Sequence, residues 1–472
     1  MAINHGVSVT ERSTSVSAPV VAATGIPFVV GVAPVHTADD PATAGVPVLC
    51  TSWDEAVSKL GYSEEWDKFT LCEFMYSHFV LYGMQPVIFL NLLDLTTMKA
   101  PVTAKDYDVV DHKVNLGTLA MNNDALVVKA NDTTLTIDTD YKAYYSNGEL
   151  IVELLSSGTS YAAAKLNIAH EAVAPANVTV SDVAVAMEKV ELCMTLLGET
   201  PDMICAPGFS HDAAVAAVMA SKAAAINGMF KAKALIDIPT GEDGATVYSD
   251  VLSVKNARAM TDKDQLPCWP MVGFSGKKYH MSTHLAGVMA SVDTENGDPR
   301  ESPSNKAMKI DSLITEDGSE VLLTLAQANI LNGNGIITAL NFMGGFKAWG
   351  NYTACYPTNT DVKDYFISVS RVFDWVGNTL IRTFWSYLDK PMTRRLIDSI
   401  LDTANIWMNG LAGSGCILGG RVEMIESENT QADLMAGIIK LHVYITPPSP
   451  LQELDFTLEY DVSYVQEALA AQ

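Results

Sequence analysis

Basic residues are scarce in this chain of 472 residues. Lysine and arginine together number 30 against 55 aspartates and glutamates, which gives a formal net charge of −25. Such a surface repels nucleic-acid phosphates and anionic lipids, so we expect no direct nucleic-acid binding and no membrane insertion. The uncharged run 18–35 is long enough for a membrane helix, but its three prolines and two glycines favour a turn followed by a buried strand.

Cysteine is also sparse. The chain has seven cysteines, no two of them form C-x-x-C, and none lies in a cluster of histidines. This pattern argues against a disulfide framework or a zinc knuckle, and it favours reduced thiols in a cytosol. His280 and His284 stand four residues apart but lack the glutamate of the helical zinc motif, so we predict no metal site. The first residues lack the basic and apolar stretches of a signal peptide.

Motifs for nucleotide binding and catalysis are missing as well. The segment GFSGKK lacks the spacing of a phosphate loop, and GSGCIL from Gly413 has only two of the three dinucleotide-binding glycines. Ser210, His211 and Asp212 are adjacent, whereas members of a catalytic triad come together from separate segments. We therefore predict no enzyme activity and no cofactor, and we read Ser210 as a helix cap. An α/β enzyme remains a weaker alternative.

Apolar residues, in contrast, make up 48% of the chain, enough for a large core. Residues 26–95 read as buried strands that alternate with two helices. Ser52 with Glu55 and Thr70 with Glu73 have the spacing of capping boxes at the starts of those helices. Residues 176–345 continue the alternation, which predicts a largely parallel sheet. In this part the polar segment 293–304 reads as an exposed loop.

Between these two parts, residues 96–175 have a different texture. Short alternating runs are separated by turn signals such as N-N-D and S-N-G. This pattern predicts a small antiparallel β domain inserted into the α/β part.

Residues 346–450 contain two long amphipathic helices with an excess of basic residues. From 363 to 395 there are six basic and three acidic residues, and from 421 to 472 there are two basic and nine acidic. The stripe formed by Arg371, Arg382, Arg394 and Arg395 is either an ordinary solvated helix face or a docking surface for an acidic partner.

Both ends of the chain read as strands without a core of their own. Val7 and Val9 alternate with polar residues in the N-terminal segment 1–25. In the C-terminal segment 451–472 one row of alternate residues is entirely apolar, consisting of Leu454, Phe456, Leu458 and Tyr460. An exposed apolar strand is an aggregation hazard unless a partner covers it, so we expect both ends to add to sheets of neighbouring molecules.

Several segments, in this order along the chain, together resemble the tail sheath proteins of contractile phage tails and related injection systems, including phage-tail-like bacteriocins. They are HGVSVTE, GIPFVVGVAP, VPVLCTSWDEAVSKLGY, TLCEFMYSHFVLYG, WGNYTACYP, the helix with paired arginines, GIIKLHVY with PPSP, and LDFTLEYD. The resemblance covers residues 1–95 and 345–472 well and residues 181–345 more loosely. It does not distinguish a phage from a bacteriocin or another injection system.

The resemblance implies an α/β and α+β multidomain protein, with a sheath-type core, two extended arms and an inserted antiparallel β domain. It further implies a structural subunit that forms stacked rings around an inner tube protein, contacts baseplate and tail-terminator proteins, and contracts to drive the tube through a target envelope. The expected location is a virion tail or injection particle assembled in the bacterial host cytoplasm. Another self-assembling protein, such as a capsid or surface-layer subunit, is the other structural alternative.

Overall fold

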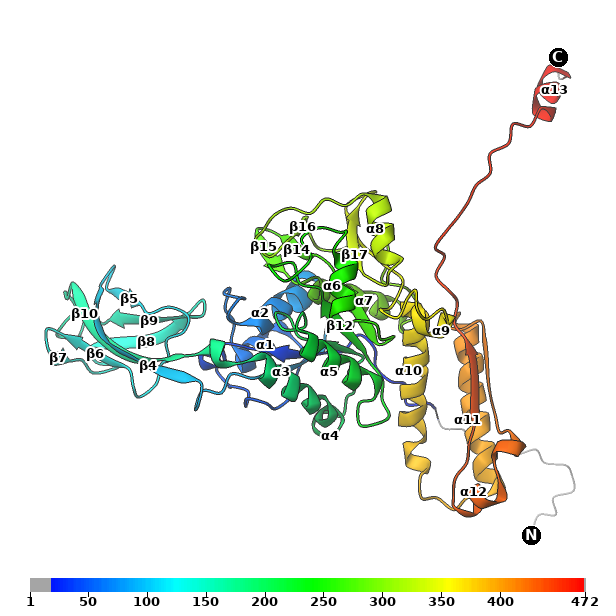
Figure 1. Cartoon of the computed structure of the whole chain (residues 1–472). Coiled ribbons are helices and arrows are strands. Elements are labelled where there is room, and N and C mark those ends of the chain that lie inside the picture. Colours follow the sequence, from blue (N-terminus) through cyan, green and yellow to red (C-terminus); the bar gives the residue numbers. More distant parts are fainter. Residues whose placement is uncertain (1–17, 471–472) are drawn as a thin grey trace, which may run out of the picture.

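The computed structural model describes residues 18–470. Figure 1 shows an α/β body at the centre, a β-rich lobe on one side and a pair of long helices on the other. The C-terminal segment leaves the molecule as an extended arm that ends in a short helix. The mixed α/β multidomain class expected from the sequence is confirmed.

A six-stranded sheet forms the centre of the body. Its order is β13-β12-β11-β1-β3-β2, and every neighbouring pair is parallel except β2 with β3. The strands are β1 (Pro27–Gly31), β2 (Val48–Cys50), β3 (Val87–Asn91), β11 (Met203–Cys205), β12 (Lys233–Asp237) and β13 (Gln265–Cys268). Because β1 pairs with both β3 and β11, residues 26–95 and 176–345 share one sheet instead of forming two separate bodies.

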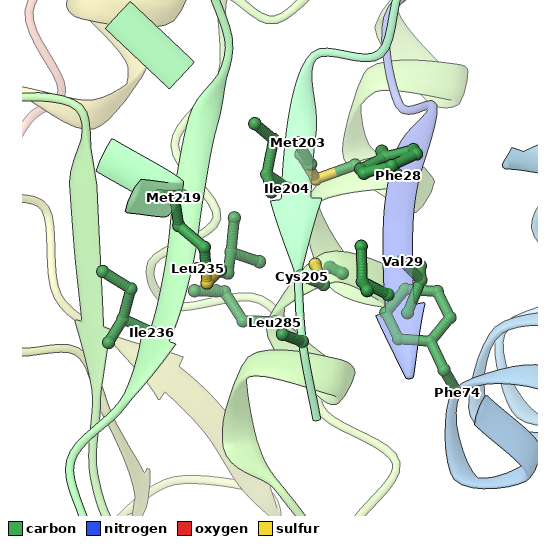
Figure 2. Packing of buried hydrophobic residues seen from close by; sticks show 14 of the residues in the cluster. Phe28, Val29, Phe74, Met203, Ile204, Cys205, Met219, Leu235, Ile236 and Leu285 are labelled. Carbon is green, nitrogen blue, oxygen red and sulfur yellow. The ribbon is translucent and has the colours of Figure 1, made fainter. Parts of the chain in front are cut away.

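The sheet is buried by helices. The helices of this body are α1 (Trp53–Leu60), α2 (Thr70–Met75), α3 (Val180–Ala186), α4 (Cys193–Leu197), α5 (Ala213–Ala224), α6 (Val251–Ala257), α7 (Met281–Asn296) and α8 (Leu325–Asn332). Figure 2 shows Phe28, Ile204 and Leu235 from three strands packed with Phe74 of α2 and Leu285 of α7, and all five are fully buried. Each such side chain contributes about 1.5–3 kcal/mol through burial.

Three predicted helix caps have different outcomes. Ser52 caps α1 as predicted, because its hydroxyl accepts from the backbone N–H of Glu55 at 3.2 Å. Thr70 lies inside α2, and its hydroxyl accepts from the backbone N–H of Val32 instead. Ser210 is also not a cap, because Asp212 caps α5 and the Ser210 hydroxyl donates to Asp237. The last two predictions are therefore wrong, and both side chains tie neighbouring segments together.

Residues 99–173 form the β-rich lobe through antiparallel pairing alone. Its two sheets are β4-β10-β6-β7 and β5-β9-β8. The strands are β4 (Lys99–Asp108), β5 (Lys113–Asn115), β6 (Val127–Ala130), β7 (Thr133–Thr134), β8 (Tyr141–Ser146), β9 (Glu149–Leu154) and β10 (Lys165–Val173). Val128, Val152 and Ile168 belong to a hydrophobic cluster separate from that of the body, so this lobe has its own core.

Two small antiparallel sheets complete the body. They are formed by β14 (Met271–Phe274), β15 (Lys277–Tyr279) and β16 (Ser312–Ile314), and by β17 (Thr338–Asn341) and β18 (Phe346–Trp349). The sequence CWPMVGF, which reads as one strand, is divided between β13 of the central sheet and β14 of the first small sheet.

The remaining part is built on two long antiparallel helices. Its elements are α9 (Val362–Tyr365), α10 (Ile367–Phe384), α11 (Arg394–Gly413), β19 (Gly419–Glu423), α12 (Gln431–Met435) and β20 (His442–Thr446). Val372 and Trp375 of α10, Met408 of α11 and Val422 of β19 belong to one buried cluster. The apolar stripes predicted for the two helices therefore face each other and the β19–β20 hairpin.

Candidate functional site

The C-terminal arm, residues 453–470, lies away from the rest of the molecule (Figure 1). The hydroxyl of Tyr352 donates to the side-chain oxygen of Gln452 at 2.6 Å, and every residue from Glu453 to Ala470 is exposed. The predicted apolar row is uncovered, with Leu458 94% exposed and Leu454, Phe456 and Tyr460 each at least 65% exposed. A long apolar row in water is unfavourable, and this indicates a surface meant for a partner.

Within the part of the chain that the structure describes, the arm has no strand partner. Residues 451–461 are extended without regular secondary structure, and α13 (Ser463–Ala470) follows them. The prediction that Leu454, Phe456, Leu458 and Tyr460 form an inter-subunit strand thus stays a prediction, and the sequence analysis missed α13. Val7 and Val9 lie outside the described residues.

The β19–β20 hairpin offers a matching sheet edge. Within residues 18–470, β19 and β20 pair only with each other, in a register from Gly419↔Thr446 to Glu423↔His442. The amide of Asn405 on α11 both donates to and accepts from the backbone of Val422, each at 2.8 Å. The hairpin is therefore fixed on α11 at the outer edge of β19, whereas the outer edge of β20 has no strand neighbour within residues 18–470.

The start of the described chain runs along α10. The backbone N–H groups of Val20 and Ala22 donate to the hydroxyls of Thr383 and Thr379, each at 3.0 Å. The indole N–H of Trp375 donates to the carbonyl of Ala22 at 2.8 Å. Val20 and Ala22 consequently lie on the same two-helix unit that carries the hairpin.

Arg371 does not belong to a basic surface stripe, so the prediction for this residue is wrong. Its side chain is only 4% exposed and forms ion pairs with Asp202 at 2.8 Å and with Asp293. Asp293, predicted in an exposed loop, lies buried near the end of α7. Burial alone lowers the pKa of Arg371, but the two carboxylates raise it overall, so the guanidinium stays charged. Arg371 and Asp293, which the sequence analysis placed at the surface, thus pair with each other in the interior.

The other three arginines differ in exposure. Arg382 is largely buried and pairs with Glu199 at 3.0 Å. Arg394 and Arg395 begin α11 and are exposed, and Arg394 pairs with Asp398 one turn later at 2.9 Å. Of the four predicted arginines, only Arg394 and Arg395 therefore form an exposed basic surface, at the start of α11. The partial positive charge of the helix N-terminus adds to their charge.

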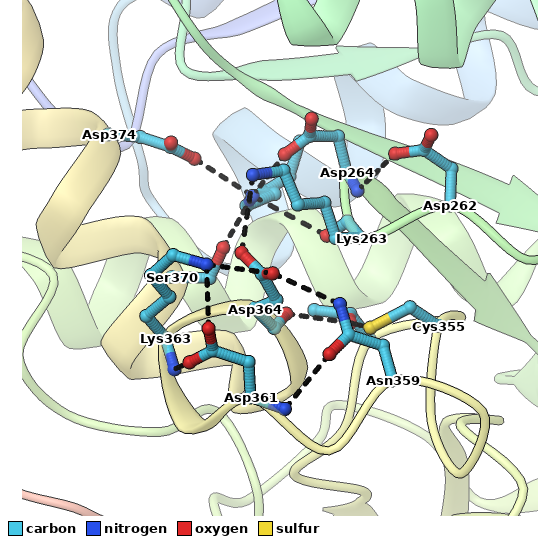
Figure 3. Close-up of polar contacts among 12 residues, drawn as sticks. Asp262, Lys263, Asp264, Cys355, Asn359, Asp361, Lys363, Asp364, Ser370 and Asp374 are labelled. Carbon is cyan, nitrogen blue, oxygen red and sulfur yellow. Dashed lines mark hydrogen bonds and ion pairs between the residues drawn. The ribbon is translucent and has the colours of Figure 1, made fainter.

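A second buried ion cluster joins α10 to the body. The ammonium group of Lys233 on β12 contacts Asp264 at 2.5 Å, Asp374 at 2.8 Å and the Ser370 hydroxyl at 2.8 Å. Figure 3 shows this network continuing through Lys263 to Asp364 of α9. Burial lowers the pKa of Lys233, but Asp374 and Asp264 raise it overall. A lysine in an apolar strand pattern gave no signal for this role.

A cleft of about 1060 Å³ lies at the carboxyl edge of the parallel strands, where open α/β sheets bind ligands. Glu73 accepts from the backbone N–H of His280 at 2.6 Å and contacts its Nδ1 at 2.8 Å. Burial lowers the pKa of His280, but the charge and hydrogen bond of Glu73, with Asp237 and Glu316, raise it to about 9. His280 and Glu73, two of the titratable residues that line the cleft, are thus bound to each other.

The remaining chemical candidates are dispersed. The Ser210 hydroxyl contacts Asp237 at 2.8 Å, whereas Asp212 accepts from backbone N–H groups of α5, so the adjacent triad residues do not converge. Nδ1 of His284 contacts the hydroxyl of Tyr82 at 3.1 Å inside the core. Over residues 18–470 no three His, Cys, Asp or Glu side chains gather as a metal-ligand set. In the same range, no helix combines the length and hydrophobicity that a bilayer span requires.

Comparisons with known proteins agree on one family. Residues 176–354 match the family model described as the phage tail sheath protein central domain. The tail sheath protein of Burkholderia phage BcepMu is 25% identical over 407 residues, covering 81% of this chain and 83% of the relative. The chain thus resembles phage tail sheath proteins over most of its length, and residues 176–354 match the central domain of that family. The tail sheath protein of Escherichia phage P2 is 26% identical over 190 residues, which span 39% of this chain and 46% of that protein.

Solved structures of sheath proteins have the same fold over nearly the whole chain. The sheath of the extracellular contractile injection system PVC in its contracted state matches with a TM-score of 0.60 and 14% identity, covering 98% of this chain and 99% of that one. The sheath tail protein of Desulfitobacterium hafniense matches with a TM-score of 0.53 and 13% identity, covering 89% and 93% of the two chains. The fold of a sheath protein therefore extends well beyond the matched central domain.

Proposed function

We propose that this chain is the repeating structural subunit of a contractile tail sheath. In this role it polymerises helically around an inner tube and contracts to drive the tube through a target envelope. The observation that carries the proposal is the uncovered C-terminal arm, whose apolar row requires a partner, on a molecule that also presents a hairpin with an unpaired edge on β20.

The arm and the hairpin of a neighbouring copy complement each other chemically. An added strand gains main-chain hydrogen bonds along β20, because Asn405 already occupies the backbone of Val422 on the edge of β19, and its alternate side chains enter the apolar layer above α11. The opposite row carries Asp455 and Glu459, and the exposed face of the hairpin carries Arg421, whose guanidinium lies 4.1 Å from the ring centroid of Tyr444. Apolar burial on one face and opposite charges on the other favour the same orientation.

An arm donated by each copy to the next makes a head-to-tail contact. Contacts of this kind produce open helical filaments when the rotation between copies does not close a ring. The partners in this proposal are further copies of the chain, an inner tube protein, and baseplate and tail-terminator proteins. No cofactor takes part, and the particle is assembled in the bacterial host cytoplasm.

Contraction would be a rigid-body rearrangement of subunits. The buried ion clusters around Arg371 and Lys233 fix α10 to the body, so these parts move together. The extended residues that follow Gln452 can change their backbone angles and act as the joint between copies. A lattice trapped in an extended state behind a barrier stores its energy at assembly and needs no nucleotide to contract.

Negative-stain electron microscopy of the purified chain tests the proposal. We expect hollow cog-wheel sleeves from the wild type, whereas shells, flat lattices or single globules would contradict a sheath role. The variant Leu458→Asp places a charge in the apolar row of the arm. It also removes a side chain whose burial contributes about 1.5–3 kcal/mol to each contact between two subunits, so sleeves should be lost. The neighbouring substitution Thr457→Asp adds the same charge to the polar row and should leave sleeves intact.

A further inference from the structure

The terminal helix α13 has no packing partner among residues 18–470. All eight of its residues are exposed, and Tyr464, Val465 and Leu469 form an apolar face. Helices shorter than about 12 residues are marginal in water, so a stable α13 requires contact with another surface. We propose that α13 docks into an apolar groove of a second copy of this chain. This proposal rests on the polymerisation proposed above. It adds a contact between copies besides the one made by the donated strand.

The groove has a volume of about 550 Å³ and lies where the end of α10 meets the end of α4 and the turn at residues 227–230. Its apolar lining residues are Val20, Met194, Met229, Phe230, Ile381 and Trp385. Trp385 is 59% exposed, so a large aromatic surface faces water in the isolated chain. Aromatic anchors in a desolvated pocket contribute most to protein–protein affinity.

Charge and sequence both favour the C-terminal arm as the occupant. Arg382 is the charged member among the described lining residues, and residues 453–470 contain five acidic and no basic side chains. The N-terminal alternative is poorer, because residues 8–17 contain only two valines and no larger apolar side chain. Tyr464 and Leu469 thus supply apolar side chains that can fill the groove, and Glu467 is a second carboxylate for Arg382, which already pairs with Glu199 of its own chain.

The direction of the arm favours a second copy over its own chain. The arm departs beside Tyr352, next to α9, and Figure 1 shows it leading away from the end of α10 where the groove lies. Ten residues separate Gln452 from Ser463, so α13 can reach about 33–36 Å from its anchor. This reach exceeds the length of α10, which is about 27 Å for its 18 residues.

Disulfide trapping tests the contact directly, because the seven native cysteines are all buried. One preparation carries Leu469→Cys and a mass tag, and the other carries Trp385→Cys. The two are mixed, assembled and mildly oxidised. We expect a disulfide-linked pair containing one chain of each kind, which non-reducing electrophoresis resolves by the tag. Val465→Cys on the same helix face provides a second position if Leu469→Cys unfolds α13.

Matched controls define specificity. In the first control pairing, Leu458→Cys in the apolar row of the arm is used in place of Leu469→Cys. In the second, Leu322→Cys, at a side chain that is 79% exposed and lies outside the groove, is used in place of Trp385→Cys. Neither control pairing should give more than a tenth of the linked product. Equal linkage in the controls, or none at both helix positions, would overturn the docking proposal.

Two further readouts separate this inference from the proposed function. Sleeves in micrographs of the same mixture without a specific link would overturn the docking of α13 and leave polymerisation standing. Absence of both sleeves and links would overturn both proposals. A doubly substituted chain that links to itself at a dilution without sleeves would show docking within one chain, which contradicts the second copy as host.

Discussion

At the scale of single residues, Arg371 supports the joint between the two-helix unit and the body. Arg371→Met leaves Asp202 and Asp293 without their buried counter-charge, and removal of one partner from such a cluster costs about 3–5 kcal/mol. Urea unfolding should show this loss. Arg394→Met, at a side chain that is 85% exposed, should change stability by less than about 0.5 kcal/mol. Equal effects of the two substitutions would contradict the role given to Arg371.

The pair of His280 and Glu73 makes stability depend on pH. The pKa of His280 is raised from 6.5 to about 9 in the folded chain, so the folded state holds this proton more tightly than the unfolded state. The stabilisation is complete below about pH 6.5 and is lost as the pH rises through 9, to a total of at most about 3 kcal/mol. Urea unfolding of wild type and His280→Gln between pH 6 and 9.5 should show curves that converge at high pH. Parallel curves would exclude this linkage.

Sequence reasoning at this scale succeeded where a residue acts locally and failed where it acts at a distance. Ser52 caps the helix that directly follows it. Glu73 has the spacing of a capping partner, but it reaches His280, which is 207 positions away in the chain. Arg371 likewise carries a charge that is typical of surface residues, but it pairs with the buried Asp293 in the interior. Nothing in local spacing distinguishes these cases, because the partners are brought together only by the sheet.

At the scale of elements, the start of α11 is the exposed basic surface that remains from the predicted stripe. We propose that it holds the inner tube electrostatically in the extended state. Arg394→Glu with Arg395→Glu should weaken assembly on tubes and remove the inhibition of that assembly by added salt, measured by co-sedimentation with tubes. Lys142→Glu with Lys165→Glu changes the net charge equally on the exposed β-rich lobe and should have little effect. Unchanged extended assembly of the arginine variant would remove the idea.

The elements themselves were predictable where one face or the whole segment is apolar. The buried strands at 27–31 and 87–91 and the stripes of α10 and α11 follow from periodicity. The order of the strands in the sheet could not be predicted from periodicity, because β1 could have paired with any of several equally apolar strands. The helix α13 was missed because its eight residues directly follow an alternating run, although Asp461 before it accepts from the backbone N–H of Ser463. The exposed edge of the β19–β20 hairpin could not be predicted from the sequence, because whether a strand lies at an edge depends on the strand order of the sheet.

At the scale of the whole molecule, the β-rich lobe is an autonomous addition. The backbone N–H of Ala174 donates to the carbonyl of Met98 at 2.9 Å, so the two connections of the lobe lie side by side. Replacement of residues 99–173 by a short Gly-Ser linker should leave a folded body that still forms sleeves. We expect a loss of about 3–6 kcal/mol in urea unfolding, because Met121 and Val173 no longer pack in the core of the body and His36 loses its contact with the carbonyl of Thr118. Sleeves that disappear although the body stays folded would place the lobe in the lattice.

The central position of β1 has a consequence for synthesis on the ribosome. β1 is translated first, yet one of its two sheet neighbours, β11, begins only at Met203, after the whole lobe has been made. The lobe needs only its own strands, so we expect it to fold on the nascent chain while β1 still waits for its neighbour. Proteolysis of chains arrested before and after β11 should find the lobe protected in both and β1 protected only in the longer one. Protection of β1 in the shorter chain would contradict this order of events.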